Sequence, residues 1–253
     1  MYPKLIDISH WQGEMDWDKF MQSDAEGCII RAGSCNNNTG IPYTDYNYEQ
    51  NMTGVEFATE IIGTYWYWRA NHDPIKQADY YADLLKYKKW NLAPVADVES
   101  RGNVNQSTLQ SRLKKFVDRL QVRTGYKPII YSRASFWNPY VGNPSWASSY
   151  DFWAARYNGS LSGPWSDGRY KPVSWNDWTF WQYSADGNGL GRTYGASSRD
   201  VDLDRFNGTL EELRKYAGLD KPPVPVPPPS DKVCITEGVA HDMYLELKGV
   251  FEG

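Results

Sequence analysis

The sequence has 253 residues, a net charge of −4 and an isoelectric point near 5.5, and 41% of its residues are hydrophobic. That length predicts one large domain or two small ones, and the apolar content is enough for a packed core, which excludes an intrinsically disordered chain. No run of basic residues exceeds two, so a nucleic-acid partner is not expected. No apolar run reaches the roughly 18 residues of a transmembrane helix, so no membrane insertion is expected.

Short apolar stretches alternate with stretches of helical spacing along most of the chain. In the first half, the predicted elements are a strand at 5–9, a helix at 16–23, a strand at 28–33, a polar loop at 34–47, a helix at 48–59, a strand at 61–68 and a helix at 74–89. In the second half, they are a short strand within 93–100, a helix at 107–123 with Ser107 as its N-cap, strands at 128–132, 152–157, 178–183 and 201–204, and a helix at 209–216.

This order repeats strand and helix about five times and then continues with strands that have little helix between them. Alternating strands and helices predict an α/β fold with a parallel sheet and external helices. Eight strands in a chain of this length predict a closed, TIM-like barrel in which the later helices are largely lost.

Polar residues occupy the C-terminal ends of the predicted strands: Asp7, Arg31, Tyr65, Asp97, Glu99, Tyr131, Arg156 and Asp202. In such barrels these ends form the rim of the active site. A general preference of charged residues for strand ends explains part of this set. It does not easily explain four acids with few lysines beside them.

Asp97 and Glu99 are the most informative of these acids. Residues two apart in a strand point the same way, which places their Cβ atoms roughly 7 Å apart. Two acids at this spacing resist ionising together, which leaves a proton donor beside a carboxylate, as glycoside cleavage requires. The alternative is that these acids cap the next helix or pair with a lysine.

The cysteines and histidines indicate no cofactor. Cys28, Cys35 and Cys234 are too few for a disulfide framework, and a Cys28–Cys35 bridge is left open. The histidines are far apart and no Cys/His ligand spacing occurs, so neither a metal nor another cofactor is expected. The first residues lead directly into a strand, without the pattern of a signal peptide.

The C-terminal part differs from the rest of the sequence. Residues 222–229 are a polyproline run, which predicts a stiff spacer. The expected division is a catalytic barrel at 1–217, a proline-rich linker at 218–229 and a short tail at 230–253. The tail is too short for a core of its own, so it is a partial wall-binding module, an oligomerising piece or a disordered end.

Several motifs together resemble the glycoside hydrolase family 25 lysozymes, the Chalaropsis-type muramidases of phages, bacteria and fungi. The first is Asp7-Ile8-Ser9-His10-Trp11-Gln12-Gly13, followed by Asp16-Trp17. The others, in the family's order, are Ile30-Arg31-Ala32-Gly33, Gly63-Thr64-Tyr65, Asp97-Val98-Glu99, Pro128-Ile129-Ile130-Tyr131, Trp153-Ala154-Ala155-Arg156-Tyr157, Trp181-Gln182-Tyr183 and Val201-Asp202-Leu203. The resemblance covers about residues 4–217.

The resemblance implies a (β/α)5(β)3 barrel that hydrolyses the β-1,4 bond between N-acetylmuramic acid and N-acetylglucosamine in bacterial peptidoglycan. Phage members often carry a linker and a wall-binding module, so a phage or prophage endolysin is the expected origin. Such an enzyme is made in the host cytoplasm and acts on the wall after release; a secreted enzyme without its signal is the alternative. Trp66-Tyr67 stand where many members read His-Phe, which is expected to alter the groove.

The four acids receive roles on this basis. Glu99 is the hypothesised general acid, and Asp97 beside it is expected to raise its pKa. The resemblance implies that Asp97 also orients the substrate N-acetyl group, which attacks the anomeric carbon in place of an enzyme nucleophile. Asp7 and Asp202 are expected across the cleft, where they stabilise positive charge or position water.

Five further residues are predicted to bind substrate. Tyr65, Tyr131 and Trp153 would shape the sugar subsite. Arg31 and Arg156 would orient the acids or substrate carboxylates. For all five, core packing and ion pairing are equally consistent with the sequence.

Two other functions fit the same residues. A chitinase-like N-acetylhexosaminidase would use the same acids on another substrate, and digestion of chitin oligomers would separate it from a muramidase. A catalytically weak cell-wall-binding protein would bind walls without releasing reducing ends, although the presence of all four acids argues against it. Self-association through the tail is a further possible interaction.

Overall fold

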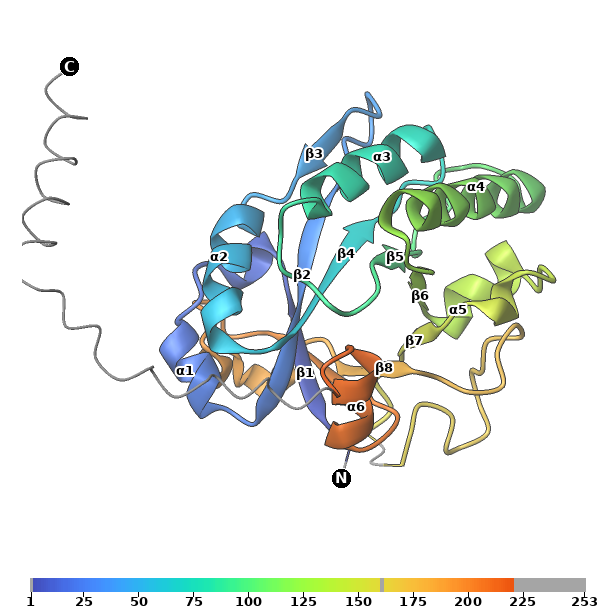
Figure 1. Ribbon diagram of the computed structural model, residues 1–253. Coiled ribbons are helices and arrows are strands. Elements are labelled where there is room, and N and C mark those ends of the chain that lie inside the picture. Colours follow the sequence, from blue (N-terminus) through green and yellow to red (C-terminus); the bar gives the residue numbers. More distant parts are fainter. Residues whose placement is uncertain (1, 160–161, 221–253) are drawn as a thin grey trace, which may run out of the picture. The chain divides into compact units, whose positions relative to one another are not determined.

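The computed structural model describes residues 2–159 and 162–220 (Figure 1). The predicted tail at 230–253 and all but the first residues of the predicted linker at 218–229 lie outside the described residues. The division into barrel, linker and tail therefore stays a prediction.

The described residues form one sheet that closes into an eight-stranded barrel. The strands run in the order β1-β9-β8-β7-β6-β5-β4-β2, and β1 pairs with β2 to complete the ring. Their bounds are β1 Lys4–Ile8, β2 Ala25–Cys35, β4 Ile61–Tyr67, β5 Val95–Asp97, β6 Ile129–Ser132, β7 Phe152–Ala155, β8 Phe180–Ser184 and β9 Asp202–Phe206. All neighbouring pairs are parallel except those of β9, which runs antiparallel to β1 and β8.

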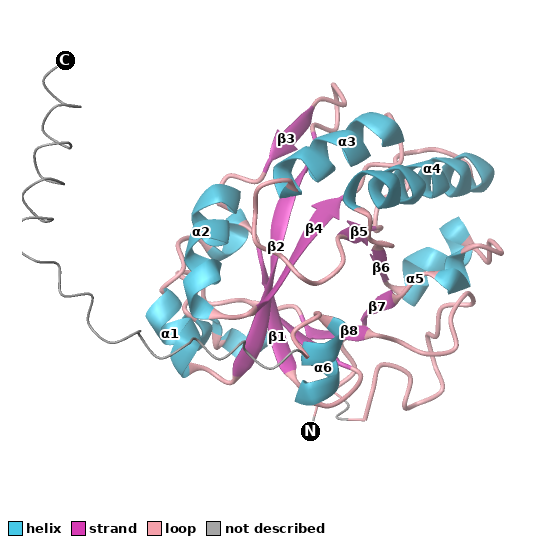
Figure 2. Ribbon diagram, viewed as in Figure 1, coloured by secondary structure: helices cyan, strands magenta, loops and turns pink. Residues whose placement is uncertain are grey.

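The order of the elements confirms the predicted five strand–helix units followed by three strands. The helices are α1 Trp17–Gln22, α2 Tyr48–Ala58, α3 Pro74–Leu85, α4 Gln106–Thr124, α5 Ala134–Phe136 and α6 Leu210–Tyr216. Figure 2 shows loops, rather than α-helices, between β7 and β8. Residues of the segment after β7, among them Tyr157 and Tyr170, line a groove beside the site.

Three local predictions need correction. The expected loop at 34–47 contains β3, Pro42–Thr44, because this segment pairs antiparallel with the long end of β2. Helix α3 ends at Leu85 rather than at residue 89. The N-cap of α4 is Asn105, whose side chain accepts the Thr108 N–H at 2.9 Å, while Ser107 donates its hydroxyl to the same Asn105 oxygen.

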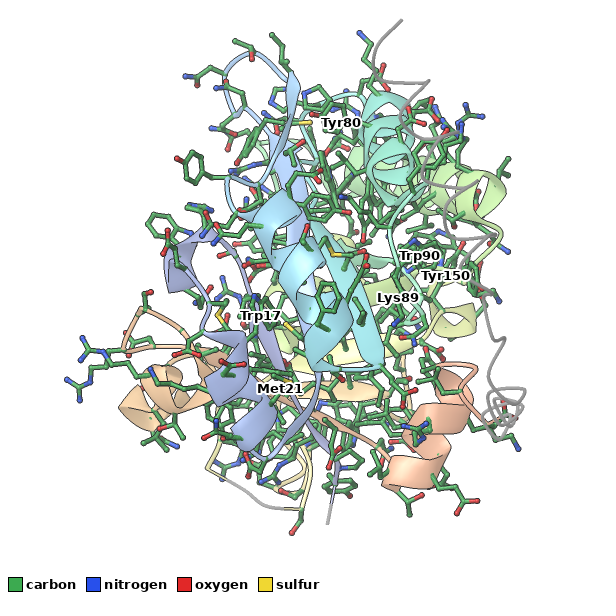
Figure 3. The ribbon with its side chains drawn as sticks, turned by 60° about the vertical axis from the view of Figure 1, so that its left-hand side comes forward. Trp17, Met21, Tyr80, Lys89, Trp90 and Tyr150 are labelled. Carbon is green, nitrogen blue, oxygen red and sulfur yellow. The ribbon has the colours of Figure 1, made fainter. Side chains whose placement is uncertain are left out.

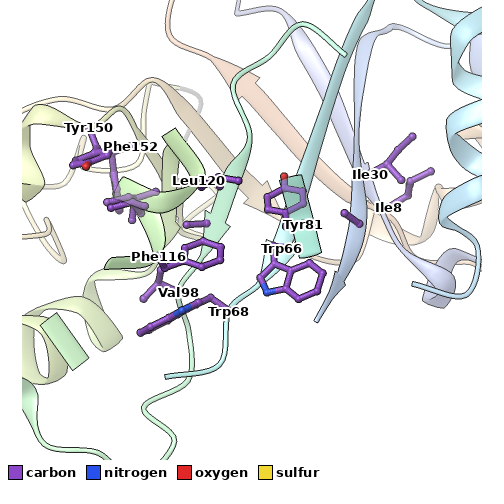
Figure 4. Packing of buried hydrophobic residues seen from close by; sticks show 14 of the residues in the cluster. Ile8, Ile30, Trp66, Trp68, Tyr81, Val98, Phe116, Leu120, Tyr150 and Phe152 are labelled. Carbon is purple, nitrogen blue, oxygen red and sulfur yellow. The ribbon is translucent and has the colours of Figure 1, made fainter. Parts of the chain in front are cut away.

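A thick layer of aromatic and aliphatic side chains lies between the barrel and the helices (Figure 4). Trp66 stacks on Tyr81 of α3 with ring centroids 5.7 Å apart, and Trp68 lies beside Phe116 of α4. Each such buried ring contributes about 1.5–3 kcal/mol of hydrophobic stabilisation. Trp66 therefore supports the helix layer, whereas Tyr67 is half-buried and close enough to Asp97 and Glu99 for their charges to raise its pKa.

Close contacts also join the helices to one another. In Figure 3, Trp17 of α1 lies beside α2, and its indole occupies the space where a Cβ at Gly54 would be. Glycine at this position thus permits the two helices to approach. Cys28 and Cys35 are both buried and both free, so the bridge left open by the sequence does not form.

A second apolar cluster fills the lower part of the barrel. Leu5, Val95, Ile129 and Phe180 meet there, near the N-terminal ends of the parallel strands. Helix α6 closes this end with Leu213, which is fully buried, and with neighbouring side chains of the same cluster. The open end of the barrel is therefore the opposite one, at the carboxyl ends of the strands.

Candidate active site

The site occupies the barrel interior directly above the apolar cluster. Because side chains alternate along a strand, the inward residue two positions beyond an apolar one lies one layer higher. The pairs Val95 and Asp97, and Phe180 and Gln182, follow this rule. The resulting small pocket is lined by Asp7, Tyr65, Asp97, Glu99, Tyr131, Trp153, Gln182 and Asp202.

Asp97 and Glu99 share one wall of the pocket, as predicted. Strand β5 ends at Asp97, so Glu99 lies beyond the strand rather than within it. The chain between them is nevertheless held against β6, because the Val98 N–H donates to Tyr131 O at 2.9 Å and Ser132 Oγ donates to Val98 O at 2.7 Å. Asp97 is buried, and Glu99 is partly exposed to the opening.

Burial raises the pKa of both carboxyls in this pair. The charge of Glu99 raises the pKa of Asp97 further, and the Arg31 guanidinium lowers it. For Glu99, the charge of Arg133 and a hydrogen bond with Asp97 lower the pKa. Removal from water is thus the largest cause of the raised pKa of each carboxyl, and the effect of Asp97 on the pKa of Glu99 stays a prediction.

The opposite wall carries three carboxyls. Strand β9 pairs with β1 so that Asp202 is opposite Asp7 and Asp204 is opposite Leu5. Both Asp202 and Asp204 lie close enough to Asp7 to change its pKa. Asp204 is completely buried, and one of its oxygens accepts the Trp153 indole N–H at 2.8 Å.

These three carboxyls differ in how easily they ionise. Burial raises the pKa of Asp7 to about 6, while hydrogen bonds from Gln182 and from the two other aspartates lower it. Burial and then the charge of Asp7 raise the pKa of Asp202 to about 9 and hold that of Asp204 well above its usual range. Asp7 thus has the lowest pKa of the three carboxyls, and its two neighbours hold their protons to a higher pH.

Gln182 fixes the geometry of this wall. Its amide nitrogen donates to Asp7 Oδ2 at 2.7 Å. Its amide oxygen accepts the hydroxyls of Tyr131 at 2.8 Å and Tyr157 at 2.6 Å. A single side chain therefore links Asp7 to the buried Tyr131 and to the exposed Tyr157.

Of the five predicted substrate-binding residues, three line the pocket and the two arginines lie outside it. Tyr65, Tyr131 and Trp153 line the pocket together with the acids. Arg31 is nearly buried outside the pocket, with its Nε 3.8 Å from Asp45 Oδ2, and its charge still acts on Asp97.

Arg156 lies in a neighbouring groove, and Asp167 pairs with it at 2.6 Å.

Two polar residues of this site were not among the predicted site residues. Asp204 follows Asp202 at the same two-residue spacing that singled out Asp97 and Glu99, so that signal was present in the sequence. Gln182 lies in the aromatic strand β8, where a polar residue between two rings was the available indication.

Neither a metal centre nor a membrane span is found in the described residues. Within 2–159 and 162–220, no group of three or more His, Cys, Asp or Glu side chains is arranged to hold a metal ion. In the same part of the chain, every helix is too short or too polar to cross a bilayer.

Comparison with known proteins identifies relatives for most of the chain. Residues 6–192 match the family described as glycosyl hydrolases family 25. Lysozyme M1 of Streptomyces globisporus is 33% identical over 225 residues, which cover 84% of this chain and 70% of that protein. The N,O-diacetylmuramidase of Chalaropsis sp. is 25% identical over 228 residues, which cover 84% of this chain and 97% of that protein.

Solved structures share the fold. The bacterial lysozyme from Streptomyces coelicolor superimposes with a TM-score of 0.72 and 28% identity, over 87% of this chain and 99% of that one. A family 25 lysozyme from Aspergillus fumigatus gives a TM-score of 0.69 at 22% identity, over 86% and 99%. At that lower identity the likeness concerns the fold alone.

Proposed function

The chain belongs to family 25 of the glycosyl hydrolases, and we propose that it is a muramidase in which Glu99 is the general acid. Its substrate is bacterial peptidoglycan, and the bond cut is the β-1,4 bond between N-acetylmuramic acid and N-acetylglucosamine. The observation that carries the assignment of Glu99 is its position: a partly exposed carboxyl, beside a buried second carboxyl, at the opening of a pocket lined by acids and aromatic rings.

Glu99 is suited to protonate the leaving oxygen. Burial raises its pKa, so the group keeps its proton over part of the range in which an unperturbed glutamate would have lost it. Its partial exposure leaves room for a sugar oxygen. Asp97, which is more deeply buried, would accept a hydrogen bond from the substrate N-acetyl group and direct its oxygen to the anomeric carbon.

The opposite wall supplies the balancing charge. Asp7 is the first of its three carboxyls to ionise, and it accepts hydrogen bonds from neighbours that keep their protons. An anion held there would stabilise the positive charge that develops on the sugar ring or on the acetamido nitrogen. Asp202 would then act as a donor or position water.

The aromatic residues would hold the sugar in place. Tyr131 is fixed by its hydrogen bond to Gln182, and Trp153 by its bond to Asp204. The two rings meet edge to face, with centroids 4.8 Å apart. This arrangement gives the sugar a rigid, amphipathic wall at low entropic cost.

Digestion of purified peptidoglycan tests the proposal. The products are reduced with borohydride, which marks each new sugar end, and are identified by mass spectrometry. Reduced muramic acid ends are expected. Reduced glucosamine ends would show that the enzyme cuts the other bond, as an N-acetylhexosaminidase would, and wall binding without new ends would favour a binding protein.

The place of action follows from the substrate. The enzyme acts on the bacterial cell wall, and we propose that it reaches the wall after release from the cell that makes it. An origin as a phage endolysin stays a prediction.

A further inference from the structure

A groove opens beside the pocket and shares Glu99 with it. The walls of the groove include Arg133, Ser135, Arg156, Tyr157 and Tyr170. Arg133 follows the end of β6, and Arg156 follows the end of β7, so both lie on the rim of the barrel. The groove is thus continuous with the position at which the glycosidic bond would be cut.

The two arginines of this groove differ in their partners. Arg156 pairs with Asp167 at 2.6 Å, donates to the backbone oxygen of Arg169, and lies 4.8 Å from the centroid of the Tyr170 ring. Arg133 is exposed, and within the described residues its guanidinium makes no hydrogen bond or ion pair. Its charge is nevertheless close enough to act on Glu99.

The aromatic wall of the groove is held in an unfavourable backbone conformation. Tyr170 has a φ of +54°, in the left-handed region that non-glycine residues rarely adopt. The loop is tied in place, because Asn138 donates to Lys171 O and accepts the Val173 N–H. Strain of this kind persists where the surroundings enforce it, and here it keeps the ring over Arg156.

We propose that this groove binds the carboxylates of the stem peptide carried by the muramic acid next to the bond that is cut, with Arg133 as the principal contact. The inference rests on the muramidase activity proposed above. The N-acetylated sugars of the glycan carry no charge that would pair with a free guanidinium. The peptide is attached to the muramic acid two ring carbons from the anomeric carbon at which Glu99 would act, and it carries carboxylates, which arginine binds well.

Direct binding tests the proposal without relying on cleavage. The probe is N-acetylmuramoyl-L-alanyl-D-glutamate, which has no glycosidic bond to cut, and the reference is the same molecule with both carboxylates converted to amides. The wild-type chain is expected to bind the acid form about fivefold more tightly, the range for one exposed charge pair. Arg133→Gln should abolish this preference, whereas Arg133→Lys should retain part of it.

The matched control is Arg101→Gln. Arg101 is also exposed, but it lies over the Tyr140 ring and does not line the groove. This variant should keep the full preference for the acid form. Equal binding of the acid and amide forms by the wild-type chain would overturn the proposal, as would a preference that survives in Arg133→Gln.

A kinetic comparison separates peptide binding from an effect on Glu99. Arg133→Gln should lower kcat/KM about fivefold more on intact peptidoglycan than on glycan strands freed of peptide, because loss of its charge near Glu99 affects both substrates alike. An equal loss on both substrates, with a shifted pH profile, would mean that Arg133 serves the acid and would overturn the proposal. Selective binding of the acid form through Arg133 without any cleavage would support the groove and refute the muramidase assignment.

Discussion

The pocket contains two groups of carboxyls that differ in what balances their charge. Asp97 and Glu99 lie within the influence of Arg31 and Arg133, whose guanidinium groups favour ionisation. Asp7, Asp202 and Asp204 are balanced instead by protons that they share and by the amide of Gln182.

This contrast shows how one fold can hold five acids in a small volume. Desolvation makes each additional buried anion more costly, so a group without a cation keeps its protons. The group beside the arginines can exchange a proton with substrate near the opening. The group on the other wall supplies a fixed arrangement of one carboxylate and two neutral donors.

Replacing the acid at the opening should have the largest effect. Glu99→Gln keeps the shape of the side chain but removes the transferable proton, so kcat should fall about 10²–10⁴-fold. The fold should be unchanged, as measured by circular dichroism and thermal unfolding. Glu26→Gln, at an exposed position on β2, is the control and should retain activity within about twofold. A folded Glu99→Gln protein with nearly full activity would show that the general acid lies elsewhere.

Asp204 tests the difference between the two groups of carboxyls, because its proposed state is the protonated, neutral one. Asp204→Asn offers an N–H to Asp7 and an oxygen to the Trp153 indole, so activity should stay within about threefold of the wild type. Asp204→Leu leaves the indole without its acceptor and should destabilise the fold by about 1–3 kcal/mol. The measurements are kcat and the free energy of unfolding in urea. If the asparagine variant is as impaired as the leucine variant, Asp204 acts as an anion.

The parts of this pocket that the sequence predicted are those governed by local alternation. Asp97 and Glu99 were predictable because their spacing and the apolar residues before them fix which way they point. The barrel followed in the same way from the order of apolar stretches. These inferences needed no knowledge of which distant segments meet.

The parts that were missed depend on register and on long side chains. The contact of Asp204 with Asp7 requires the antiparallel pairing of β9 with β1, which brings together residues nearly 200 positions apart in the chain. The same holds for Gln182, whose bonds join three strands. Arg31 was placed at the right strand end, but its long side chain turns toward Asp45 rather than into the pocket.

The group formed by Asp7, Asp202 and Asp204 should also make the free energy of unfolding depend on pH. The folded-state pKa of Asp202 is raised to about 9, above its unfolded value, so the native state holds a proton that the unfolded state has lost. The free energy of unfolding should therefore fall as the pH rises from about 4 to about 9. One such proton gives a slope of up to about 1.4 kcal/mol per pH unit.

Urea unfolding at pH 5, 7 and 9 measures this slope. Asp202→Asn carries no titrating group at this position, so its stability should change less with pH than that of the wild type. Asp200→Asn removes an exposed carboxyl two residues earlier and should leave the slope unchanged. A wild-type protein that becomes more stable between pH 5 and pH 9 would contradict the protonated state proposed for Asp202.

The smallest effect is expected from removing the residues after 220. Helix α6 closes the end of the barrel beneath both groups of carboxyls. Its Leu213 is fully buried, and its Tyr216 packs against Phe180 and Phe206. A chain that ends at residue 220 keeps this helix and should retain its activity, with a free energy of unfolding within about 0.5 kcal/mol of the full chain. A chain that ends at residue 208 loses the helix and should be destabilised by at least about 2 kcal/mol, since it exposes the Leu213 contacts. If the chain that ends at residue 220 failed to fold or to hydrolyse peptidoglycan, the barrel could not be the self-sufficient catalytic unit that the sequence predicts.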